Sequence, residues 1–213
     1  MNTNDCFFTV GHQATGIYKE KGSSFMAQVY PIRSEPEVKI ILSELKKVHP
    51  KARHICYGYR FGPDQEYHRI NDDGEPSGTA GRPILGQLIK HALENTLITV
   101  VRYFGGTLLG ASGLGNAYKS AAESAISNAE IVSIMRKSYF EFEYKYSSEK
   151  FIESCIKMLQ GRIESKSYSE SVKAKISFPI SKSESVIETI RDFAIKSRWS
   201  EEIMVHFLSK DPY

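Results

Sequence analysis

The chain has 213 residues, of which 41% are hydrophobic and 25% charged, a composition typical of a globular protein that buries a core. Its formal charge of +3 at pH 7 is too small to indicate a nucleic-acid-binding protein by itself. No apolar stretch approaches the roughly 18 residues of a membrane-spanning helix, and no secretory signal pattern is present. Three scattered cysteines, Cys6, Cys56 and Cys155, form no C-x-x-C pair, which predicts reduced thiols. The sequence therefore predicts a cytoplasmic protein with no membrane partner.

The first 130 residues predict a mixed sheet covered by helices. Two strands are expected within residues 17–32, around a turn at Lys21 and Gly22, because the segment is rich in Phe, Val and Tyr. Hydrophobic spacing and breaker residues then predict a helix over 34–49, a strand over 55–61, a helix opening at Thr79, a buried strand over 97–104 and a helix over 112–128. One further strand before the second helix is left open.

The pattern after Glu130 predicts a second, smaller domain. Residues 131–134 are expected as a strand or a connector. Phe140, Phe142 and Tyr144 alternate with charged residues, as in a half-buried strand. A helix over 151–159, strands over 162–168 and 172–178, a helix from Ser181 or Ser183 and a final strand over 203–207 complete a βαββαβ order. The predicted fold class is therefore α+β, with a domain over residues 1–134 followed by a ferredoxin-like βαββαβ domain over 135–213.

Two glycine-dense loops are the most informative feature of the chain. They read N-D-D-G-E-P-S-G-T-A-G-R-P at 71–83 and R-Y-F-G-G-T-L-L-G-A-S-G-L-G at 102–115. Glycine costs conformational entropy on folding, so its concentration indicates positive φ angles or a ligand that approaches the main chain closely. Both loops lead into predicted helices, whose first N–H groups and dipole favour anions. We therefore predict that the two loops form one binding surface.

The predicted anion-binding residues come from both loops. They are Thr79, Gly81, Arg82, Arg102, Tyr103, Gly105, Gly106, Gly113 and Gly115. Ordinary capping by Thr79 and tight strand-to-helix packing of the second loop are the alternatives. The second loop matches neither a P-loop nor a Rossmann fingerprint, because Tyr118 stands where each needs a small residue.

The acidic residues of the first loop, Asp72, Asp73 and Glu75, suggest a divalent cation site or a group for proton transfer. The alternatives are a solvated turn and an ion pair between Arg102 and one of these carboxylates. Apart from this cation, no cofactor is expected. Cys56 lies in an apolar strand and is expected to be a buried, inert thiol, so nucleophilic catalysis has little support.

A basic cluster precedes the first glycine-dense loop. Its members are Lys46, Lys47, Lys51, Arg53 and Arg60. Such a cluster either contacts phosphates or is a solvated helix end.

Four ordered segments together resemble the YigZ/Impact family. They are K-G-S-S-F at 21–25, H-P-K-A-R-H at 49–54, N-D-D-G-E-P-S-G-T-A-G-R-P-I-L at 71–85 and V-V-R-Y-F-G-G-T-L-L-G-A-S-G-L-G-N-A-Y at 100–118. The resemblance implies an N-terminal domain like domain 2 of ribosomal protein S5 and a C-terminal domain similar to domain V of elongation factor G. It also implies a link to translation, because eukaryotic relatives regulate initiation by competing for an activator of a stress-responsive kinase. That role uses an additional N-terminal domain, so only the broad theme is carried over.

We therefore expect a non-enzymatic regulator or binding protein linked to translation, which contacts RNA, the ribosome or a protein partner. The alternative is a phosphate- or nucleotide-handling enzyme that uses the glycine-dense loops with a divalent cation.

Overall fold

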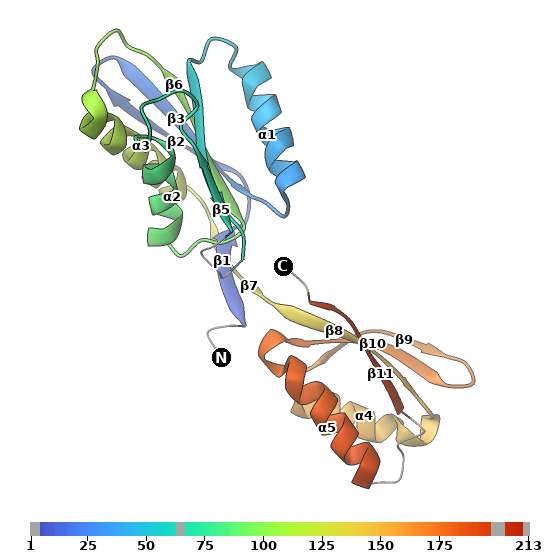
Figure 1. Ribbon diagram of the computed structural model, residues 1–213. Coiled ribbons are helices and arrows are strands. Elements are labelled where there is room, and N and C mark those ends of the chain that lie inside the picture. The colour runs from blue at the N-terminus through green and yellow to red at the C-terminus, as the bar shows by residue number, and fades with distance from the viewer. Residues whose placement is uncertain (1–4, 63–66, 197–202, 211–213) are drawn as a thin grey trace. The chain divides into compact units, whose positions relative to one another are not determined.

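The computed structural model describes residues 5–62, 67–196 and 203–210 (Figure 1). Two compact units divide the chain: one is Phe7–Ser133, and the other joins Met1–Cys6 to Ile134–Tyr213. Strands β1 (Cys6–Val10) and β7 (Ile131–Met135) pair in a two-stranded sheet, and the division between the units passes through both. Each unit combines helices with a sheet, so the predicted α+β class is confirmed. Strand β1 was not predicted.

The first unit is built on a five-stranded sheet with the order β2-β3-β6-β4-β5. The strands are β2 (Ala14–Glu20), β3 (Ser23–Pro31), β4 (His54–Arg60), β5 (His68–Asn71) and β6 (Thr96–Tyr103). Seven of the eight residues of β6 are buried, because this central strand is covered on both faces. The strand left open in the sequence exists as β5, and all four of its residues are exposed.

Helices cover both faces of this sheet (Figure 1). Helix α1 (Glu35–Val48) packs through Val38 and Leu45 on one face. Helices α2 (Gly81–Lys90) and α3 (Gly110–Ser127) pack on the other face, where Phe25 and Val100 belong to the core. Both helices begin within two residues of the predicted starts: α2 begins at Gly81, after Thr79, and α3 begins at Gly110, before Ser112.

Small residues set the distance between α3 and the sheet. Ala117, Ala121 and Ala125 are fully buried on the helix face that packs against the strands. Gly16 of β2 lies opposite, and a Cβ there would sit 2.3 Å from the backbone nitrogen of Ala125. Tight strand-to-helix packing therefore accounts for much of the small-residue content of this unit.

The second unit has the predicted ferredoxin-like order. Its elements are β8 (Lys137–Tyr144), the 3-10 turn η1 (Tyr146–Ser148), α4 (Glu149–Met158), β9 (Arg162–Tyr168), β10 (Val172–Pro179), the 3-10 turn η2 (Ile180–Lys182), α5 (Ser183–Lys196) and β11 (Ile203–Lys210). The strands pair antiparallel in the order β11-β8-β10-β9. Phe140, Phe142 and Phe178 pack against one another in the core. Within the described ranges, no helix of either unit is long and apolar enough to cross a membrane.

Candidate functional site

Residues of both glycine-dense loops line one pocket of about 450 Å³ in the first unit. This volume lies within the range of roughly 300–1,000 Å³ that small-molecule sites occupy. Charged groups and apolar side chains share the lining, which comprises Arg53, His54, Glu75, Pro76, Arg102, Phe104, Leu108, Leu109, Gly110, Ala111 and Leu114.

The register of the sheet explains why the loops meet. Strands β4 and β6 are antiparallel neighbours, and His54 at the start of β4 pairs with Arg102 near the end of β6. The second loop therefore leaves the sheet beside the start of β4. The first loop returns to the same place, because Asp73 Oδ2 accepts a hydrogen bond of 2.7 Å from the backbone N–H of Ile55. Positive φ angles at Asp73 (42°) and Gly74 (86°) make this tight return possible.

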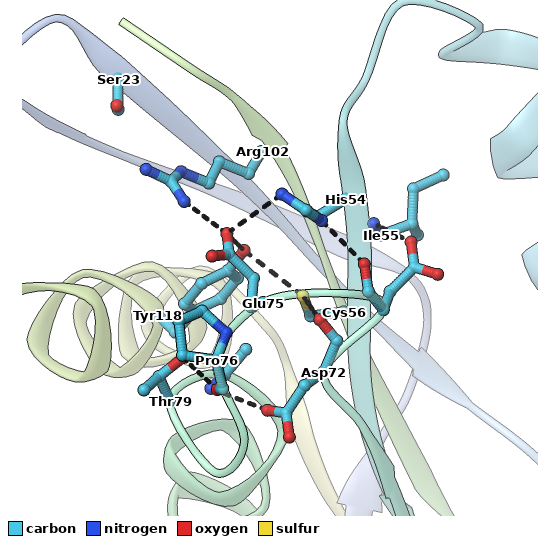
Figure 2. A network of polar contacts seen from close by, with 12 residues as sticks. Ser23, His54, Ile55, Cys56, Asp72, Glu75, Pro76, Thr79, Arg102 and Tyr118 are labelled. Atoms are coloured by element: carbon cyan, nitrogen blue, oxygen red, sulfur yellow. Dashed lines mark hydrogen bonds and ion pairs between the residues drawn. The ribbon is translucent and has the colours of Figure 1, made fainter. Parts of the chain in front are cut away.

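Glu75 is the centre of a buried polar network at the pocket (Figure 2). Its Oε1 accepts a 2.5 Å hydrogen bond from Arg102 Nη1 and a 2.8 Å hydrogen bond from the Tyr118 hydroxyl. The Arg102 guanidinium also lies 5.3 Å from the ring centre of Phe25 and 5.6 Å from that of Phe104. The network therefore fixes Arg102 in place while leaving it in the pocket lining. The ion pair between Arg102 and the acidic loop, expected as an alternative to a cation site, is present.

Arg102 satisfies only part of its hydrogen-bonding capacity in this arrangement. The residue is 5% exposed, and its buried Nε has no hydrogen-bond partner. An unpaired donor in a buried site costs free energy.

His54 extends the network on the side of β4. Its Nδ1 lies 2.7 Å from the carbonyl oxygen of Asp73, and a carbonyl oxygen can only accept, so Nδ1 is the donor. The other ring nitrogen, Nε2, lies 3.9 Å from Glu75 Oε1. A neutral His54 therefore presents a lone pair on Nε2 to the carboxylate, and a protonated one presents an N–H.

Cys56 lies beneath this network and is fully buried. Its Sγ lies 3.0 Å from the carbonyl oxygen of Asp72 and 3.3 Å from the Tyr118 hydroxyl, and its single proton can be donated to either oxygen. Burial raises the pKa of Cys56 to about 12 and also raises the pKa of Tyr118. The nucleophilic form of a cysteine is the thiolate, and a raised pKa keeps Cys56 in the protonated thiol form. Cys56 therefore acts as a hydrogen-bond donor in the core.

Asp72 organises the first loop through backbone groups. Its Oδ1 accepts from the N–H groups of Ala80 (3.0 Å) and Gly81 (2.8 Å), and its Oδ2 accepts from that of Gly78 (2.8 Å). Burial acts to raise the pKa of Asp72, but these hydrogen bonds outweigh it, so the pKa lies below its usual value. Asp72 thereby caps the start of α2 from eight residues upstream.

The three carboxylates of the first loop point to three different sets of donors. Asp72 is bound to the loop and α2, Asp73 to Ile55, and Glu75 to Arg102 and Tyr118. Over the described part of the chain, no group of three or more His, Cys, Asp or Glu side chains is placed to hold a metal ion. The structure therefore gives the predicted cation site no support.

Among the predicted site residues, only Glu75 and Arg102 line the pocket. The lining does not include Thr79, Gly81, Arg82, Tyr103, Gly105, Gly106, Gly113 and Gly115. Several of these residues have structural partners. The Thr79 hydroxyl donates to the carbonyl of Pro76, and the Tyr103 hydroxyl lies 2.8 Å from His49 Nδ1. A Cβ at Gly105 would lie 1.9 Å from the backbone of Gly22, so this glycine allows a close chain crossing.

Sequence reasoning missed several pocket residues. Arg53 was only one member of a basic cluster, and its neighbour His54 was left without a role. Phe104 was expected at the end of a buried strand but is 43% exposed, and Leu108 and Leu109 were given no role. The strongest available signal was the segment H-P-K-A-R-H, which contains both Arg53 and His54.

The start of α3 adds to the positive character of the pocket. Leu109 occupies the N-cap position and offers no side-chain acceptor, and the first turn contains no acidic residue. The free N–H groups of this turn and the helix dipole therefore favour an anion. Gly110 and Ala111 of this turn line the pocket together with Arg53 and Arg102.

Comparison with known proteins identifies the class of this chain. The family model of the Impact N-terminal domain matches residues 21–126, which include every residue of the pocket lining. IMPACT family member YvyE of Bacillus subtilis is 33% identical over 168 residues, which cover 78% of this chain and 76% of YvyE. IMPACT family member YigZ of Escherichia coli is 28% identical over 182 residues, which cover 84% of this chain and 89% of YigZ. A crystal structure of a hypothetical protein aligns with a TM-score of 0.66 at 25% identity, over 97% of this chain and 99% of that one. The chain belongs to the IMPACT family.

Proposed function

We propose that this chain is a cytoplasmic regulator linked to translation that acts by binding RNA. The link to translation is what membership of the IMPACT family implies. The cytoplasmic location is inferred from the three cysteines, which are all free thiols.

One observation carries the choice of RNA: the pocket joins two guanidinium groups to an uncapped helix start. Arg53, Arg102 and the first turn of α3 line the same space. Guanidinium groups and helix N-termini are recurrent binding groups for phosphate. Exposed Leu108 and Phe104 beside them offer apolar surface on which a base can lie. The nearby thiol of Cys56 is buried and protonated, which favours binding over nucleophilic catalysis.

RNA binding measured against salt concentration tests this proposal. A gel-shift or anisotropy titration with single-stranded RNA should show affinity that falls as salt rises, because phosphate contacts release counterions. Arg53→Ala should weaken binding and reduce the slope of log K against log salt by about 0.7, the value for one contact on a single strand. Lys51→Ala is the matched control, because Lys51 is exposed, close in sequence and outside the pocket lining. Absence of binding even at low salt would exclude RNA as the partner.

The ribosome and a translation-linked protein remain the other partners to test. Co-sedimentation with ribosomes under the same salt series distinguishes them from free RNA. Sedimentation with ribosomes that persists in Arg53→Ala would place the contact outside this pocket.

The second candidate function is a phosphate- or nucleotide-handling enzyme that uses the same pocket with a divalent cation. It is favoured by the α3 N-terminus and opposed by the engagement of all three loop carboxylates. A ligand at 100 times its Kd stabilises a protein by about 2.7 kcal/mol, so thermal shifts with nucleotides and magnesium provide a test. Stabilisation that requires magnesium, together with release of phosphate, would establish this function in place of the first.

A further inference from the structure

We propose that the pocket binds a phosphate monoester, the terminal phosphate of a nucleotide or of an RNA end, in preference to a phosphodiester within a strand. This inference rests on the proposed function, that the pocket contacts RNA, and it names the chemical group that is recognised.

The charges that line the pocket match a dianion. Arg53 and Arg102 supply two positive charges, Glu75 removes one, and the α3 N-terminus contributes about half a positive charge. The net charge of these groups is about +1.5, and His54 is left out of this sum. A phosphate monoester carries about −1.5 to −2 at pH 7, whereas a diester carries −1. The monoester therefore neutralises the pocket more completely.

The donors in the pocket also suit a group with several terminal oxygens. Arg102 is held by Glu75 and its guanidinium lies over the rings of Phe25 and Phe104, so its orientation is set before a ligand arrives. The first turn of α3 provides further N–H groups, and exposed Arg53 provides a second guanidinium. A monoester offers three terminal oxygens to these donors, while a diester offers two.

The apolar lining indicates what is attached to the phosphate. The apolar part of the pocket lining consists of Pro76, Phe104, Leu108, Leu109 and Leu114. Phe104 and Leu108 are 43% and 83% exposed, so their surfaces are available to a base or sugar. A nucleotide has this combination of a dianionic end and a flat apolar body.

Two RNAs of one sequence, one with a 5′-phosphate and one with a 5′-hydroxyl, test the inference by fluorescence anisotropy. We expect the 5′-phosphorylated RNA to bind at least about tenfold more tightly, the factor that corresponds to one charge-assisted hydrogen bond. AMP should compete with it, and adenosine should not.

A substitution that adds a negative charge to the pocket tests ligand binding without destabilising the fold. Ala111→Glu adds a carboxylate to the first turn of α3, where the helix dipole stabilises a negative charge. The same carboxylate lies in the pocket lining, where it repels a phosphate. Ser112→Glu adds the same charge to the same turn outside that lining and is the matched control. Ala111→Glu should abolish the preference for the 5′-phosphate with no loss of thermal stability, and Ser112→Glu should retain most of that preference.

The possible outcomes distinguish this inference from the proposed function. Equal binding of both RNAs, reduced by Arg53→Ala, would overturn the inference and leave RNA binding intact. AMP binding without binding of either RNA would support the monoester site and overturn RNA as the partner. Failure of AMP and of both RNAs to bind would overturn both. A 5′-phosphate preference that Ala111→Glu leaves unchanged would place the recognition elsewhere and overturn the inference.

Discussion

Arg102 and Glu75 form a buried ion pair, with Nη1 and Oε1 2.5 Å apart and side chains only 6% and 3% exposed. The pair joins the end of the central strand β6 to the acidic loop, 27 residues earlier in the chain. Removal of one member of a buried pair leaves the other charge desolvated and uncompensated. The pair therefore contributes to the order of the pocket and to the stability of the unit.

Glu75→Gln should lower the free energy of unfolding by about 3 kcal/mol. This is the lower end of the range for breaking a buried pair, because the adjoining pocket admits water. Denaturation in urea measures the change. The control is Glu123→Gln, which breaks the surface pair with Lys90, where the side chains are 40% and 54% exposed. It should cost less than about 1 kcal/mol. Equal costs at the two positions would contradict the role assigned to the buried pair.

Asp72→Asn should reduce stability at pH 7 by about 1 kcal/mol, the typical value for the loss of a helix cap. The pKa of Asp72 is lower in the folded state, so the unfolded state binds more protons in acid. The stabilisation by the ionised Asp72 is therefore complete only above the unfolded pKa of about 3.9. It is lost as the pH falls through the lower, folded pKa. Urea denaturation from pH 7 to pH 3 should show the difference between wild type and variant shrinking in acid. A difference that does not change with pH would contradict the assignment.

Gly105→Ala should destabilise the first unit by about 1–3 kcal/mol, the usual cost of overpacking. Its Cβ would meet the backbone of Gly22 and Ser23, which cannot move aside as a flexible side chain can. Gly86→Ala in α2 is the control, because nothing lies within 4 Å of a Cβ there. That variant should be about 0.5–1 kcal/mol more stable, since alanine favours a helix interior. Thermal unfolding of both variants gives the comparison. An unchanged stability of Gly105→Ala would contradict the close approach of Gly105 to Gly22.

Cys56 should resist alkylation in the native protein at pH 8. It is fully buried, and burial raises its pKa to about 12, while the pKa of Cys155 is raised to about 11. A Cys6→Ser variant removes the partly exposed third thiol. In this variant, reaction with a thiol reagent should wait for unfolding and then proceed at both cysteines. Rapid native modification of Cys56 would indicate an accessible nucleophile and would favour the enzymatic alternative.

Much of the fold was predictable because its core elements carry strong hydrophobic patterns. The buried run of β6 and the alternation of Phe140, Phe142 and Tyr144 in β8 are examples. Strand β5 could not be assigned firmly, because all four of its residues are exposed and so lack an apolar signal. Strand β1 was missed because its partner β7 lies more than 100 residues away in the chain. No local sequence pattern indicates such a pairing.

The site was predictable at the level of segments but not of side chains. Glycine density indicated where the chain approaches itself closely, as at Gly105. It could not show that Asp72 and Asp73 would bind backbone N–H groups, because that depends on how the loop folds back over β4. Tyr118 was noted only for breaking a phosphate motif, yet it donates to Glu75 from within the core. The partners of a polar side chain are set by tertiary packing, which spacing along the chain does not reveal.

The most direct measurement is an NMR titration of the ¹⁵N-labelled protein with the 5′-phosphorylated RNA. We expect amide shifts to concentrate in both glycine-dense loops, at Glu75 and from Phe104 to Ala111, and we expect Arg53→Ala to suppress them. Shifts confined to one loop, or found only in the second unit, would contradict the claim that the two loops form a single binding site.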